Sequence, residues 1–185
     1  MPLEIDPATG LARDVRQVLS PHYDARPAGA VPELLVIHGI SLPPGEFGGP
    51  WIDQLFTGNL SASGHEYFAQ LGGLRVSAHF FIARSGRLTQ CAPLLARAWH
   101  AGESSFEGRP ACNDFSIGIE LEGTDETAYE PIQYLRLAEL IRALLTACPT
   151  LGAERIVGHS DIAPGRKTDP GPSFDWMHLR TLLAA

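Results

Sequence analysis

The sequence predicts a mixed α/β fold in which a β-sheet is flanked by helices. Short apolar runs rich in branched residues, at 33–40 and 115–123, are typical of buried strands. Leucine and isoleucine recur at helical spacing across residues 131–148, and Pro131 suits the first turn of that helix. Several strands combined with a few helices favour one sheet with helices packed against it.

Length and composition fit one folded domain. With 185 residues, 44% of them hydrophobic, the chain has enough apolar side chains for a core. We therefore expect a single domain over residues 1–185, with residues 1–20 as an N-terminal arm. The net charge of −7 argues against binding to nucleic acid or to an anionic membrane, and no obligate protein partner is evident.

The chain start and the cysteines favour a cytoplasmic location. The segment MPLEIDPATG lacks the basic and apolar regions of a signal peptide. Cys91, Cys112 and Cys148 are odd in number and far apart, so they form no disulfide framework. Cys148 falls on the apolar stripe of the helix at 131–148, where we expect it to pack in the core.

The other elements are predicted from turn residues and hydrophobic periodicity. Residues 76–84 and 87–94 form a β-hairpin around Ser85-Gly86. The C-terminal helix is expected over 173–185, with Ser173 as its N-cap. The remaining expectations are short helices near 10–18, over 51–59 and within the loop 60–75, loops at 41–50 and 104–114, and short strands at 96–102 and 154–159.

Two of the predicted strands end in a histidine, His38 and His159, and strand ends are where functional groups gather in α/β sheets. Asp169 follows ten residues after His159. Two imidazoles, a carboxylate and one open position for water form the ligand set of a catalytic zinc ion. Because the chain has seven histidines, an alternative is that both are structural and that Asp169 is a turn residue. The residues alone leave both interpretations open.

For two further charged residues, a structural and a functional interpretation are again both possible. Glu120 lies within the apolar strand at 115–123, on the face opposite its isoleucines. It is either a solvated edge residue or a general acid/base whose pKa is raised by partial burial. Lys167, two residues before Asp169, is either a solvated loop residue or a cation that stabilises an oxyanion.

Five segments of the chain together resemble a known enzyme family. They cover about residues 20–180 and read LLVIHGISLPPGEFGGPWIDQLFTG, LRVSAHFFI, RAWHAG, CNDFSIGIELEGTD and GHSDIAPGRKTDPGPSFDW. They resemble the AmpD-type 1,6-anhydro-N-acetylmuramyl-L-alanine amidases, within the wider zinc N-acetylmuramoyl-L-alanine amidase family. The resemblance implies a mixed β-sheet flanked by helices, with one Zn²⁺ in a surface groove.

The resemblance also implies an activity. It is hydrolysis of the amide between (anhydro-)N-acetylmuramic acid and L-alanine in an anhydro-muropeptide, during cytoplasmic peptidoglycan recycling that limits β-lactamase induction. Glu120 would move the proton, and Lys167 would share the oxyanion with zinc. The alternatives on the same fold are a non-catalytic peptidoglycan-binding module and a wall-lytic amidase.

Individual roles follow from the same resemblance. His38, His159 and Asp169 match the zinc ligands, Glu120 and Lys167 match the catalytic positions, and Arg75, Trp99 and His100 are candidate substrate-binding residues. His79 is expected to be structural. Two positions depart from the family pattern, since Gly39 replaces an asparagine and Ala111 an arginine, with Arg109 close to it. How the peptide carboxylates are bound is therefore open. Asp161 and Arg166 are expected to brace the loop that follows His159.

Overall fold

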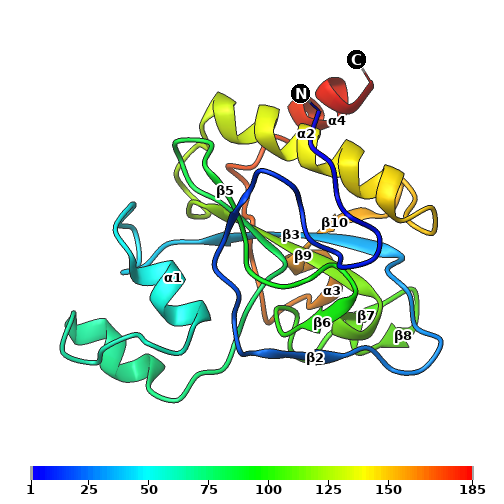
Figure 1. The fold of residues 1–185 in the computed structure, drawn as a ribbon. Coiled ribbons are helices and arrows are strands. Elements are labelled where there is room, and N and C mark those ends of the chain that lie inside the picture. Colours follow the sequence, from blue (N-terminus) through cyan, green and yellow to red (C-terminus); the bar gives the residue numbers. More distant parts are fainter. Residues whose placement is uncertain (1, 185) are drawn as a thin grey trace.

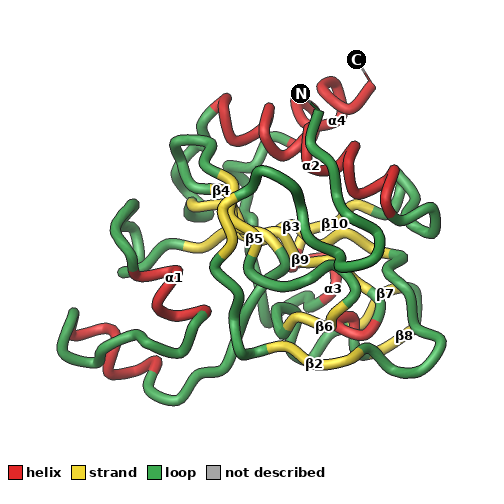
Figure 2. Tube along the Cα trace, viewed as in Figure 1, coloured by secondary structure: helices red, strands yellow, loops and turns green. Residues whose placement is uncertain are grey.

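A six-stranded sheet forms the centre of the molecule in the computed structural model, which describes residues 2–184 (Figures 1 and 2). β5 runs antiparallel to β4, and the other neighbouring strands of this sheet are parallel. The predicted mixed sheet is thus confirmed. In spatial order the strands are β1 (Arg16–Gln17), β5 (Leu88–Gln90), β4 (Phe80–Ile82), β9 (Ser116–Glu122), β3 (Leu34–Ile40) and β10 (Ile156–Gly158).

Two helices, α2 (Pro131–Ala147) and α4 (Trp176–Ala184), pack on one face of the sheet (Figure 1). Alternation along the strands turns one set of apolar side chains toward them. The resulting main core joins Leu35, Ile37, Ile117, Ile119 and Leu121 of the sheet to Leu137, Leu140, Ile141 and Leu144 of α2. Cys148 is 7% exposed, in agreement with its predicted core position. Among residues 2–184, no helix combines the length and the apolar character needed to cross a bilayer.

The opposite face of the sheet carries two smaller apolar clusters. The first lies under α1 (Trp51–Phe56) and η1 (Glu66–Leu71), and comprises Leu42, Ile52, Leu55, Phe56, Phe68, Ala78, Phe81, Ala83 and Cys91. The second lies beside η2 (Cys112–Asp114) and α3 (His159–Ile162), and comprises Leu34, Val36, Ala101, Cys112, Phe115 and Ile162. A small sheet of β2 (Tyr23–Ala25) and β6 (Ala96–Ala98) adjoins this face.

Three predicted elements differ in the structure. Residues 10–18 form no helix, because Gly10 turns the chain at φ +69° and β1 joins the sheet edge. Residues 104–114 are not only loop: β7 (Ser105–Phe106) and β8 (Arg109–Pro110) pair around Glu107 and Gly108, whose positive φ angles suit a tight hairpin. The C-terminal helix begins at Trp176, later than the sequence predicts.

The cap of that C-terminal helix explains its later start. The Asp175 carboxylate accepts the N–H of His178 at 2.8 Å, so Asp175 and not Ser173 caps α4. The other predicted elements are confirmed in position. Gly86 (φ +79°) turns the β4–β5 hairpin, and the predicted short helix within 60–75 is η1.

The buried Gln90 side chain attaches the N-terminal arm to the sheet. Its amide nitrogen donates to the carbonyls of Gly10 and Ala92, and its oxygen accepts the N–H of Ala12. Gln17, its partner in the β1–β5 register, is exposed and makes one long contact, 3.3 Å, to the Ala12 carbonyl.

We expect Gln90→Met to lower the free energy of unfolding by about 2–4 kcal/mol, because it removes the partners of the buried Ala12 N–H and Ala92 carbonyl. The Gly10 carbonyl keeps the N–H of Leu94. Chemical denaturation monitored by circular dichroism measures this. The matched control is Gln17→Met, for which we expect a change of about 0.5 kcal/mol or less. Equal effects of the two substitutions would contradict the proposed attachment.

Candidate active site

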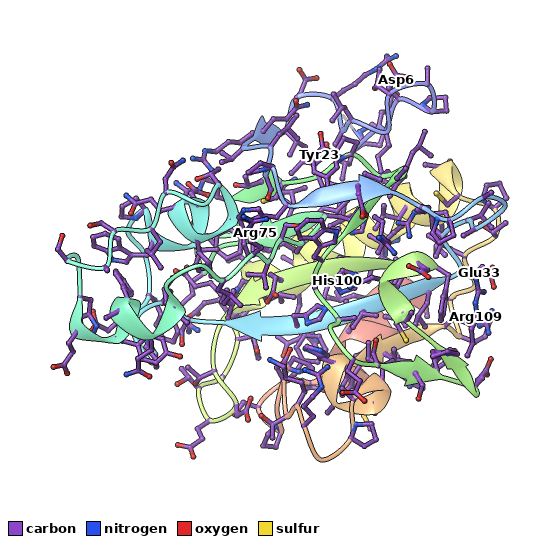
Figure 3. The ribbon with its side chains drawn as sticks, turned by 90° about the horizontal axis from the view of Figure 1, so that it is seen from below. Asp6, Tyr23, Glu33, Arg75, His100 and Arg109 are labelled. Atoms are coloured by element: carbon purple, nitrogen blue, oxygen red, sulfur yellow. The ribbon has the colours of Figure 1, made fainter. Side chains whose placement is uncertain are left out.

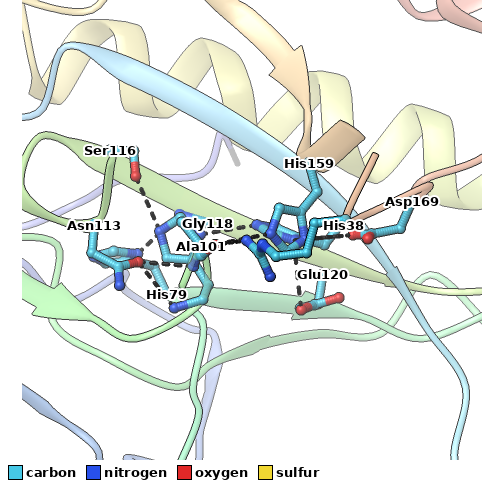
Figure 4. A network of polar contacts seen from close by, with 11 residues as sticks. His38, His79, Ala101, Asn113, Ser116, Gly118, Glu120, His159 and Asp169 are labelled. Carbon is cyan, nitrogen blue, oxygen red and sulfur yellow. Dashed lines mark hydrogen bonds and ion pairs between the residues drawn. The ribbon is translucent and has the colours of Figure 1, made fainter. Parts of the chain in front are cut away.

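The register of the parallel strands places His38 and Glu120 side by side. His38 on β3 pairs with Glu120 on β9, and both side chains point to the sheet face opposite α2 (Figure 4). They lie between the two smaller apolar clusters. Along β3, Leu34 and Val36 share this face with His38, which follows from the two-residue period of a strand.

The segment after β10 supplies His159 and Asp169, and backbone hydrogen bonds hold its two ends together. His159 follows β10 directly and opens the short helix α3, so it is not the last residue of a strand. The N–H of Ser160 donates to the Asp169 carbonyl at 3.0 Å. The Asp161 carboxylate accepts the N–H of Gly158 at 2.7 Å, which holds the turn between strand and helix.

Arg166 ties this loop to the neighbouring segment 100–103. Its guanidinium donates to the carbonyls of Ala101 and Glu103, both at 2.6 Å. Together with the contact of Asp161 this agrees with the expectation that both residues brace the loop. His159 and Asp169 are therefore held in place from two sides.

His38, His159 and Asp169 converge on one point (Figure 4). The two Nδ1 atoms are 3.0 Å apart, and Asp169 Oδ2 lies 3.2 Å from Nδ1 of His38 and 3.1 Å from Nδ1 of His159. Both histidines are buried, with 1% and 3% of their surface exposed. These three residues can hold a metal ion, as the sequence predicts.

In its neutral form, His159 offers a lone pair at this point. Its Nε2 lies 3.1 Å from the carbonyl oxygen of Ala101, which can only accept, so Nε2 carries the proton. A neutral imidazole with a proton on Nε2 offers a lone pair at Nδ1. That lone pair faces the Asp169 carboxylate, another acceptor. A cation between the two removes their repulsion, which is an observation in favour of a metal.

Glu120 borders the metal-binding residues without belonging to them. Its Oε1 lies 4.0 Å from Nδ1 of His38, and its side chain is 12% exposed. Within residues 2–184, the buried Oε2 has no hydrogen-bond partner. Burial first, and then the charge of Asp169, raise the pKa of Glu120 well above its usual value. A carboxyl group in this state is suited to accept and return a proton.

These groups open into a cavity of about 300 Å³ whose walls are partly apolar. Lys167 is exposed at its edge and lowers the pKa of Glu120 in opposition to burial. The floor is formed by His38, His100, Glu120, His159 and Asp169. The remaining lining residues are Gly39, Ile40, Ser41, Leu42, Leu55, Phe56, Tyr67, Leu71, Leu74, Val76 and Ser77.

The three candidate substrate-binding residues lie in different places. His100 lines the cavity, whereas Trp99 packs outside it, donating its indole N–H to Asp24 at 3.2 Å. Arg75 lines an adjoining hollow of about 270 Å³ next to His22, separated from the cavity at His38 by the shared side chains at positions 55, 71 and 74. The structure thus brings one of the three to the predicted metal ligands.

Other side chains make contacts near Gly39, one of the positions that depart from the family pattern, and at Arg109, which lies close to the other. A Cβ at Gly39 would lie 2.3 Å from the hydroxyl of Tyr129, which donates to the Pro170 carbonyl at 2.9 Å. Tyr129 therefore fills this space and holds the residue after Asp169. Arg109 pairs with Glu33 at 3.1 Å, and in Figure 3 it lies on the side of His100 away from Arg75. It does not line the cavity.

Sequence reasoning missed the residues that support the ligands. His79 is structural, as expected: its Nδ1 accepts the N–H of Gly118 and its Nε2 contacts the Ala96 carbonyl. The amide oxygen of Asn113 accepts the N–H groups of His100 and Ala101 at 3.1 and 2.9 Å. An asparagine in a segment predicted as loop carries no local signal for such a contact, so only the fold reveals it.

Comparison with known proteins agrees with this geometry. A model of the N-acetylmuramoyl-L-alanine amidase family matches residues 28–172. The 1,6-anhydro-N-acetylmuramyl-L-alanine amidase AmpD of Citrobacter freundii is 58% identical over 174 residues, which are 94% of this chain and 92% of its own. A crystal structure of an AmpD Se-Met derivative has a TM-score of 0.93 at 57% identity, covering 97% and 98% of the two chains.

A more distant structure contains a ligand. It is the N-acetylmuramyl-L-alanine amidase AmiD of E. coli in complex with the substrate anhydro-N-acetylmuramic acid-L-Ala-D-γ-Glu-L-Lys. It is 28% identical, with a TM-score of 0.59, and the match covers 97% of this chain and 65% of that one. The chain therefore belongs to the N-acetylmuramoyl-L-alanine amidase family of hydrolases, and within it to the AmpD type.

Proposed function

We propose that the protein is a zinc enzyme that hydrolyses the amide between the lactyl group of anhydro-N-acetylmuramic acid and L-alanine in soluble muropeptides. The observation that carries this proposal is the convergence of His38, His159 and Asp169 beside Glu120, whose buried Oε2 has no hydrogen-bond partner within residues 2–184. The names of the AmpD relatives and the substrate in the AmiD complex support the choice of substrate. Cytoplasmic recycling, as expected from the sequence, stays a prediction that cell fractionation can check.

The three ligand atoms fit tetrahedral zinc. Bonds of about 2.0–2.1 Å to imidazole and carboxylate put neighbouring ligand atoms about 3.3 Å apart in a tetrahedron. The separations of 3.0, 3.1 and 3.2 Å among the three atoms are close to that value. Two histidines and one carboxylate would leave one of the four zinc positions free for water. When bound, zinc polarises the carbonyl and lowers the pKa of a coordinated water.

Glu120 is the proposed proton carrier. Its carboxylate accepts a proton from the attacking water as the oxygen adds to the lactyl carbonyl carbon. The same proton then goes to the alanine nitrogen, and the C–N bond breaks. Burial raises the pKa of Glu120, whereas a cation held by the three ligands lowers it. The two effects act on this pKa in opposite directions.

Lys167 is proposed to oppose the negative charge on the carbonyl oxygen. It lies at the cavity edge, and its loop is fixed by Asp161 and Arg166. The N–H of Lys167 donates to the Ala163 carbonyl at 3.0 Å, so its backbone is held while its side chain faces solvent. The apolar part of the cavity wall offers a surface for the sugar.

We expect the purified protein to bind one zinc ion, and Asp169→Ala to lose it because two imidazoles alone hold zinc weakly. Elemental analysis after dialysis measures the zinc content, and chelator treatment followed by zinc addition tests recovery of activity. Lys167→Met is the control that keeps its zinc. A protein without bound zinc that added zinc does not activate would contradict the metal site.

For Glu120→Gln, we expect unchanged zinc content and a kcat lower by about 10²–10⁴-fold, because the amide cannot carry the proton. Steady-state kinetics on a soluble muropeptide measures this. Glu122→Gln on the same strand is the matched control, since its carboxylate already accepts the N–H groups of Gly48 and Arg84. It should keep kcat within about tenfold. Near-normal turnover of Glu120→Gln would exclude Glu120 as the proton carrier.

Incubation with anhydro-muropeptide in H₂¹⁸O should release free peptide and place one ¹⁸O in the lactyl carboxylate, with none in the peptide. This label position follows from the C–N cleavage described above, and mass spectrometry of both products measures it. A parallel incubation with intact sacculi distinguishes the alternatives. Release from sacculi alone would indicate a wall-lytic amidase, and no release by the zinc-loaded protein from either substrate would indicate a binding module.

A further inference from the structure

The outer nitrogens of the two ligand histidines are held by different kinds of group. Nε2 of His159 faces the Ala101 carbonyl, which fixes its proton. Nε2 of His38 lies 2.9 Å from Nδ1 of His100, a nitrogen that either donates or accepts. The nitrogen of His38 that carries the proton therefore depends on whether His100 donates or accepts at this contact.

His100 is itself the middle member of a chain. Its Nε2 lies 3.1 Å from the hydroxyl of Ser116, another group that both donates and accepts (Figure 4). The chain therefore has two directions with the same number of protons. If Ser116 donates to His100 and His100 to His38, the His38 proton sits on Nδ1 and blocks the metal-facing lone pair. In the reverse direction, His38 donates from Nε2 and its Nδ1 is free.

The surroundings of His100 hold its ring in this position. The backbone N–H groups of His100 and Ala101 both donate to Asn113. A Cβ at Gly118 would lie 2.4 Å from the imidazole, so a glycine is required for the ring to reach His38. His100 is 9% exposed, and both of its ring nitrogens have partners within the protein. Although it lines the cavity, it has no ring nitrogen free for a substrate.

We propose that His100 is a positioning residue for the metal site: it accepts the Nε2 proton of His38 at its Nδ1 and donates its own Nε2 proton to Ser116. This fixes His38 as the tautomer with a lone pair at Nδ1. The inference rests on the metal site proposed above. Metal-ligating histidines elsewhere depend on such outer partners, and their loss typically lowers metal affinity about 10–100-fold.

The direct test is long-range ¹H–¹⁵N correlation NMR of the unaltered, ¹⁵N-labelled, zinc-loaded protein. The expected spectrum has protons on Nε2 of both His38 and His100, and none on their Nδ1 atoms. A proton on Nδ1 of His100 would overturn the proposal. This measurement needs no variant, so it holds even where a substitution prevents folding.

Zinc affinity gives a second readout, measured by competition with a chelator. His100→Leu should raise the zinc Kd about 10–100-fold, because it leaves the N–H of His38 buried without an acceptor. His100→Asn should stay within about threefold of the unaltered protein, since its side-chain oxygen can accept near the position of Nδ1. Equal weakening by both variants would show that ring shape, not the hydrogen bond, matters, and would overturn the proposal.

His79 provides a matched control. It is fully buried, its ring centroid is 5.9 Å from that of His100, and its nitrogens contact Gly118 and Ala96 instead of His38. We expect His79→Leu to destabilise the fold but to change the zinc Kd less than about threefold. A rise in the zinc Kd equal to that caused by His100→Leu would overturn the inference. Failure of the unaltered protein to bind zinc would instead contradict the proposed function, so the two failures are distinguishable.

Discussion

The parallel pairing of β3 with β9 is the constraint on which the rest of the site depends. Seven consecutive pairs, from Leu34–Ser116 to Ile40–Glu122, fix the register and set His38 opposite Glu120. A slip of one residue would turn every side chain of β3 to the other face and bury His38 under α2. The main core prevents this, because Leu35 and Ile37 lose their apolar partners in any other register. Hydrophobic packing on one face therefore positions the chemistry on the other.

The face that carries the site is divided rather than uniformly apolar. One cluster under α1 and another beside α3 exclude water from both sides, and the polar groups lie in the strip between them. Burial of so many polar groups costs free energy unless each finds a partner. His79, His100 and Asn113 meet this condition through backbone and side-chain contacts. Among residues 2–184, Glu120 is an exception: its buried Oε2 has no hydrogen-bond partner, and the residue lines the cavity where the reaction is proposed.

The sequence could predict the parts of this arrangement that have a period or a family pattern. Apolar runs rich in branched residues identified β3 and β9, helical spacing identified α2, and the resemblance assigned His38, His159 and Asp169, which the structure brings together. The exceptions depend on contacts between distant segments. Residues 10–18 were predicted as a helix but contain the edge strand β1. The N–H of Ala12 in this segment donates to Gln90, which is 78 positions away. Trp99 was predicted as a candidate substrate-binding residue, yet its indole N–H donates to Asp24 on β2. No local pattern contains such partners.

The two ligand histidines also differ in how firmly their contacts determine which ring nitrogen carries the proton. The backbone carbonyl of Ala101 can only accept, so the neutral form of His159 has its lone pair at Nδ1. His38 depends on an imidazole and a hydroxyl, both of which can reverse their roles. Because consecutive residues, His100 and Ala101, provide the two outer contacts, a displacement of this single segment changes both ligands together. Asn113 and Arg166 both hydrogen-bond to that segment, so they help to hold the outer contacts of both ligand histidines.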